Sequence, residues 1–101
     1  MFVDITDEGA TLVEPDDCGR FHAQFAAGLA DDSVAEVLLR EGVGYRVDAD
    51  HVAVKVLWLR EAAQDVGGDW ADRFAKMLAF AGTKGWLADD GASVLAHIAG
   101  S

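Results

Sequence analysis

The segment D-A-D-H, residues 48–51, holds the densest group of potentially reactive side chains in the sequence. Carboxylates and imidazoles are common metal ligands. A calcium loop of the EF-hand type starting at Asp48 would need glycine at its sixth position and glutamate at its twelfth, but Ala53 and Leu59 stand there. A zinc site would need further ligands, and the other histidines and the cysteine lie far away in the sequence. We therefore interpret the segment as a turn, and we expect no metal and no cofactor.

Cys18 and His22 are the candidate catalytic residues, because they lie four positions apart in a segment with helical spacing and would share one face. A thiol near a helix N-terminus can be an activated nucleophile. Against this, Asp16 and Asp17 would raise its pKa, and a small buried cysteine is the commoner case. No catalytic residue is therefore assigned.

The candidate binding residues are Trp58, Trp86 and His51. Tryptophan is enriched in protein interfaces, and aromatic side chains line many ligand pockets. Trp86 follows a glycine in a loop, and Trp58 adjoins an apolar strand, whereas Trp70 lies on an apolar helix face that favours the core. The chain has no P-loop, G-x-G-x-x-G, G-x-S-x-G, C-x-x-C or H-E-x-x-H motif, and we recognise no family from its motifs.

The composition indicates a small acidic domain. The 101 residues are 51% apolar, and 18 acidic residues oppose 8 basic ones, which gives a net charge of −10. This length suits a single globular domain over residues 1–101. A field of this sign repels phosphates and anionic lipids, so we expect neither nucleic acid nor a membrane as partner. It would speed the encounter with a basic protein.

Several features predict a cytoplasmic protein. No apolar run approaches the roughly 18 residues that a membrane-spanning helix needs. The N-terminus, M-F-V-D-I-T-D-E, lacks the basic start and apolar core of a secretory signal. A lone cysteine excludes an internal disulfide, and this fits the reducing cytoplasm.

The elements that would position these residues follow from the spacing of apolar side chains. Alternation predicts an N-terminal hairpin over about 2–14 and a second hairpin over about 43–56, with D-A-D-H at its tip. Helical spacing and capping residues predict helices over about 17–29, 33–41, 57–65 and 69–82. We therefore expect an α+β fold in which a small antiparallel sheet is packed with three or four helices.

Two segments allow a second assignment. Asp50 could cap a helix over 51–64 in place of a strand followed by a shorter helix, although valines at a period of two favour the strand. Residues 91–98 fit either an edge strand or a short last helix.

Three functional hypotheses follow. The leading one is a non-catalytic interaction or binding module that binds a protein partner, a small ligand or a second copy of itself. The alternative is a small enzyme, or an enzyme accessory subunit, with a pocket that uses Cys18, His22 and His51. The third is an acidic antagonist of a basic protein.

Overall fold

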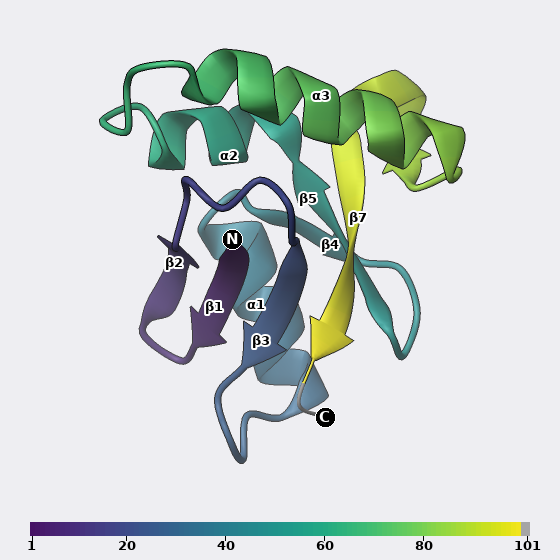
Figure 1. Cartoon of the computed structure of the whole chain (residues 1–101). Coiled ribbons are helices and arrows are strands. Elements are labelled where there is room, and N and C mark those ends of the chain that lie inside the picture. The colour runs from purple at the N-terminus through teal and green to yellow at the C-terminus, as the bar shows by residue number, and fades with distance from the viewer. Residues whose placement is uncertain (100–101) are drawn as a thin grey trace.

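Residues 1–99, which the structure describes, form one curled β-sheet with three α-helices around it (Figure 1). The structure is a computed structural model. Its strands are β1 (Phe2–Thr6), β2 (Gly9–Val13), β3 (His22–Phe25), β4 (Gly44–Arg46), β5 (His51–Lys55), β6 (Leu87–Ala88) and β7 (Ser93–Ala99). Its helices are α1 (Asp31–Arg40), α2 (Val56–Ala62) and α3 (Trp70–Thr83), and a short 3₁₀ turn, η1, covers Asp89–Gly91.

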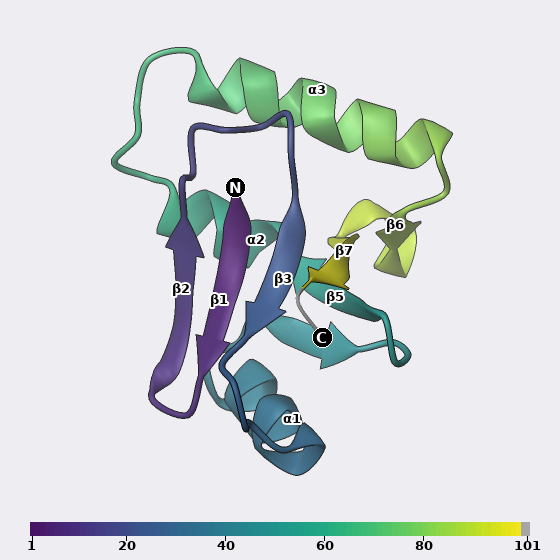
Figure 2. The same cartoon turned by 60° about the horizontal axis from the view of Figure 1, so that its bottom comes forward.

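The sheet is mixed, with the strand order β2-β1-β3-β7-β5-β4 and with β6 beside β7. The central strand β3 is parallel to both of its neighbours, β1 and β7, whereas all other neighbours are antiparallel. The centre of the sheet therefore joins the first and the last strands of the chain. α3 and α1 lie at opposite ends of the sheet (Figure 2).

One face of the sheet carries the core. Val34, Val37 and Leu38 give α1 a buried apolar stripe at helical spacing. That stripe belongs to one cluster with the inward side chains of the strands and with buried residues of the other two helices. The largest fully buried side chains of this cluster are Phe74, Ile5, Leu38, Leu59, Val3, Val34, Val43, Val52, Val54 and Val94.

The opposite face carries all three histidines of the chain. His22 of β3 is in register with His97 of β7, which is in register with His51 of β5. Phe2 of β1 continues this row on the other side of His22. Register partners on neighbouring strands point to the same side of a sheet, so the four side chains share one face.

The helix predicted over 17–29 is wrong, because β3 occupies His22–Phe25. Phe21, Phe25 and Leu29 do have helical spacing, but residues 22–25 also alternate, with Ala23 buried and the residue after it exposed. The strand gains backbone hydrogen bonds from β1 and from β7. These partners are distant in sequence, so local periodicity does not report them.

The predicted small antiparallel sheet is wrong as well, because seven strands form one mixed sheet within the described chain. The hairpins expected over 2–14 and 43–56 correspond to β1–β2 and β4–β5, but β3 and β7 lie between them. The helices expected over 33–41, 57–65 and 69–82 correspond to α1, α2 and α3. Residues 91–98 belong mostly to β7, and residues 51–64 hold β5 followed by α2.

None of the helices within residues 1–99 has both the length and the apolar character required to cross a membrane.

Candidate functional site

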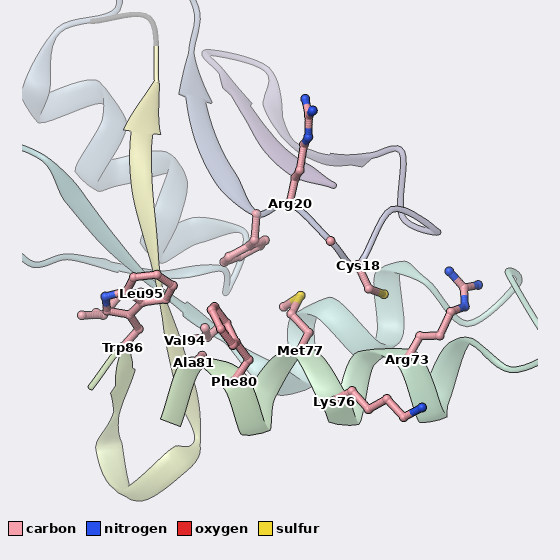
Figure 3. Close-up of a pocket in the computed structure, with 12 residues that line it drawn as sticks. Cys18, Arg20, Arg73, Lys76, Met77, Phe80, Ala81, Trp86, Val94 and Leu95 are labelled. Atoms are coloured by element: carbon pink, nitrogen blue, oxygen red, sulfur yellow. The ribbon is translucent and has the colours of Figure 1, made fainter. Parts of the chain in front are cut away.

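A cavity of about 430 Å³ lies between α3, the segment before β3 and strand β7 (Figure 3). This volume falls in the range of small-molecule binding sites. We call it the α3 cavity. Its lining residues are Cys18, Gly19, Arg20, Phe21, Arg73, Lys76, Met77, Phe80, Ala81, Trp86, Val94 and Leu95.

The helix α3 presents two stripes of side chains. Trp70, Phe74 and Ala81 are buried in the core. A second stripe lies on the face of α3 next to the buried one. Its residues are spaced three, one and three positions apart and are Arg73, Lys76, Met77 and Phe80. All four of these residues line the α3 cavity. Figure 3 shows Met77 and Phe80 projecting from α3 toward the sheet.

Trp86 forms a wall of the cavity, and the backbone fixes its position. Its backbone N–H donates to the carbonyl of Ala81 at 2.9 Å, and its own carbonyl accepts from the N–H of Leu95 at 2.7 Å. Gly85, at φ +74°, makes the turn that ends the helix just before it. The indole meets the ring of Phe80 edge to face at 6.0 Å between centroids. Phe80 is 55% exposed and Trp86 46%, so apolar surface that a ligand could cover faces solvent here.

The charged residues that line the α3 cavity are opposite in sign to the net charge of the protein. Three of the eight basic residues, Arg20, Arg73 and Lys76, are among its lining residues, and none of the 18 acidic residues is. Arg73 is held by Asp69, at 2.9 Å from its Nε, and by the carbonyl of Asp16.

Two of the basic lining residues, Arg20 and Lys76, are called the basic rim of the cavity here. They make no ion pair within residues 1–99, although Lys76 lies four positions after an aspartate. Figure 3 shows both head groups pointing outward from the apolar floor. Positive charge is therefore available at the mouth of the cavity and not inside it.

A second cavity of about 330 Å³ adjoins the first and is lined by Phe21, His51, Trp86, Leu95 and His97. Three residues, Phe21, Trp86 and Leu95, line both this cavity and the α3 cavity. We call the second one the histidine cavity. The rings of its two histidines meet edge to face, with their centroids 5.5 Å apart.

The D-A-D-H segment forms the connection into β5. The carboxylate of Asp48 accepts the backbone N–H of Asp50 at 2.8 Å and lies 3.0 Å from Nδ1 of His51. The pKa of Asp48 is lowered, chiefly by the hydrogen bond from the Asp50 backbone and next by that from His51. Within residues 1–99, no three His, Cys, Asp or Glu side chains are placed to hold one metal ion.

The structure places the candidate catalytic residues in different surroundings. Cys18 lines the α3 cavity, while His22 stacks on Phe2 at 4.8 Å between ring centroids. No hydrogen bond in the described chain joins the thiol to His22 or His51. Burial raises the pKa of Cys18, and the nearby Arg73 only partly opposes this shift. A raised thiol pKa is the reverse of what an activated nucleophile requires.

The candidate binding residues are divided as well. Trp86 lines both cavities and His51 lines the histidine cavity, whereas Trp58 packs half-buried against the core and lines neither. Sequence reasoning missed Met77 and Phe80, although the second stripe of α3 was a detectable signal. It also missed His97, for which the sequence carries no such signal.

The thiol of Cys18 is expected to alkylate slowly at neutral pH, because a raised pKa leaves less thiolate than a free cysteine has, at a pKa of about 8.5. The measurement is the rate of iodoacetamide modification between pH 6.5 and 10, followed by mass spectrometry. The inflection should lie above that of the same chain unfolded in urea. A native rate at pH 7.5 that equals or exceeds the unfolded rate would contradict the shift.

The arrangement is thus suited to binding. It combines an apolar cavity, a basic rim and an adjoining polar end, and it contains no paired nucleophile and base among the described residues. No family model matches the chain, and neither a curated protein nor a solved structure shows significant similarity to it.

Proposed function

We propose that this chain is a non-catalytic binding module whose α3 cavity takes a small amphipathic anion, an apolar molecule with one carboxylate or similar group. The observation that carries the proposal is the reversal of charge at an apolar cavity. Three basic residues and no acidic residue line it, in a chain with a net charge of −10.

The apolar body of such a ligand supplies most of the affinity in this proposal. Phe80 and Trp86 each expose about half of their surface beside the buried floor. Covering apolar surface contributes roughly 25 cal/mol per Å². A flexible alkyl chain or an aromatic ring would make such contacts with Met77 and Leu95 at the same time.

The basic rim supplies the selectivity. Arg20 and Lys76 carry their charges on long side chains that make no ion pair in the described chain, so they can turn toward an anion at the mouth. A solvent-exposed ion pair is worth about 0.2–1 kcal/mol, which corresponds to a preference of up to about fivefold. The ligand therefore differs from a neutral analogue by a measurable but modest factor.

The test compares three probes of equal chain length: decanoate and decyltrimethylammonium, each below its critical micelle concentration, and decanol, below its solubility limit. Binding to the full chain is followed by tryptophan fluorescence and by calorimetry. We expect decanoate to bind up to about fivefold more tightly than decanol, with the cation weakest. Failure of all three to bind, or tightest binding of the cation, would overturn the proposal.

Two matched pairs of variants locate the binding. Trp86→Ala should weaken decanoate binding, whereas Leu57→Ala, which removes a 73% exposed side chain outside both cavities, should not. Lys76→Glu should abolish the preference for decanoate over decanol. Lys55→Glu makes the same change in net charge away from the cavity and should preserve that preference.

A further inference from the structure

We infer that the ligand of this site carries a hydrogen-bond donor, a hydroxyl or an ammonium group, at the end opposite its anionic group. This inference rests on the proposed function and extends it into the histidine cavity. The two cavities share the walls Phe21, Trp86 and Leu95, so a molecule whose anionic group is at the α3 rim continues past the indole toward β5 and β7.

The hydrogen bond to Asp48 sets the chemistry of His51. An ionised carboxylate can only accept hydrogen bonds, so the contact of 3.0 Å requires that Nδ1 of His51 donates. In the neutral ring the lone pair is then on Nε2, which is an acceptor. His97, edge to face with this ring, makes no hydrogen bond within residues 1–99 and is free to take either role.

The charges around the histidine cavity disfavour a second anion. Asp48 and Asp50 belong to the turn that precedes His51, and no lysine or arginine of the described chain lines the cavity. The guanidinium of Arg46, in the neighbouring strand β4, is engaged by the carbonyls of Asp48 and Ala49 and by the carboxylate of Asp31.

The two ends of the combined site, the basic rim of the α3 cavity and the histidine cavity, differ in chemistry. The α3 rim is basic, the middle is aromatic and aliphatic, and the far end holds two imidazoles, one of which is hydrogen-bonded to the carboxylate of Asp48. A hydrogen-bond donor at that end finds a partner, whereas a methyl group leaves the imidazole acceptor unpaired. A net hydrogen bond of about 0.5–1.5 kcal/mol corresponds to a gain of roughly twofold to tenfold in affinity.

The test compares 10-hydroxydecanoate and 10-aminodecanoate with decanoate, and repeats the comparison with acids of eight, twelve and fourteen carbons to match the span. Calorimetry on the full chain should show the hydroxy acid of one length binding about fivefold more tightly than its parent acid. His51→Phe and His97→Phe should each lower the ratio between the affinity for the hydroxy acid and the affinity for its parent acid, both measured on the same variant.

The control is His22→Phe. This histidine lies in the same row on the same face but stacks on Phe2 and lines neither cavity, so the gain should persist in this variant. If decanoate and its homologues do not bind at all, the proposed function itself fails. If they bind but no donor at any length improves affinity, or if the gain survives in both His51→Phe and His97→Phe, only the present inference is overturned.

Discussion

Alanine at position 44 is expected to lower the free energy of unfolding by more than about 4 kcal/mol, a loss at the extreme of single substitutions. A Cβ on Gly44 would lie 1.8 Å from the carbonyl oxygen of Ala53 and 2.9 Å from its carbonyl carbon. Both atoms belong to the backbone of β5, which is paired with β4 on one side and with β7 on the other. The strand cannot retreat without breaking one of these ladders, so Gly44→Ala should disrupt the edge of the sheet.

Gly42→Ala is the matched control. Gly42 has a φ of +68°, and a Cβ built on it meets nothing within 4 Å, so only the backbone penalty of about 1–2 kcal/mol applies. Urea denaturation followed by circular dichroism and tryptophan fluorescence measures both variants. Equal losses for the two would show that the close contact at Gly44 relaxes, and would contradict the prediction.

The elements that could be predicted from the sequence are those whose evidence is local. α1 and α3 have apolar stripes at helical spacing, and the β1–β2 turn is marked by Gly9. β3 could not be predicted in this way. Its four residues pair with residues 2–5 on one side, and the first three of them pair with residues 97–99 on the other, so its identity as a strand depends on the two ends of the chain.

For the candidate site as well, the sequence indicated only those residues whose evidence is local. Trp86 and His51 stood out by residue type alone, and both line a cavity. The proposed pairing of Cys18 with His22 depended on a helix over 17–29, and it lost its basis when that segment formed a loop and a strand. His97 lies beside His51 only because β7 pairs with β5 in one register, and a slip by one residue would turn it to the other face.

In the proposed function, the two stripes of α3 separate stability from binding on a single helix. Phe74 is fully buried and stacks on Trp70 at 4.7 Å between ring centroids, and the guanidinium of Arg60 lies 5.1 Å from its ring centroid. Phe80, six residues later, is 55% exposed and lines the α3 cavity. The same substitution at the two positions should therefore affect different properties of the protein.

Phe74→Ala is expected to reduce the free energy of unfolding by about 3–5 kcal/mol, because it removes a large buried ring and leaves a cavity. Phe80→Ala should cost less than about 1 kcal/mol, because its ring is half exposed, but should weaken decanoate binding severalfold. Urea denaturation and calorimetry measure the two effects. If Phe74→Ala does not fold, Phe74→Leu, which keeps part of the volume, should still lose more stability than Phe80→Ala. A larger loss of stability at Phe80 than at Phe74 would mean that α3 packs by the face assigned here to the ligand.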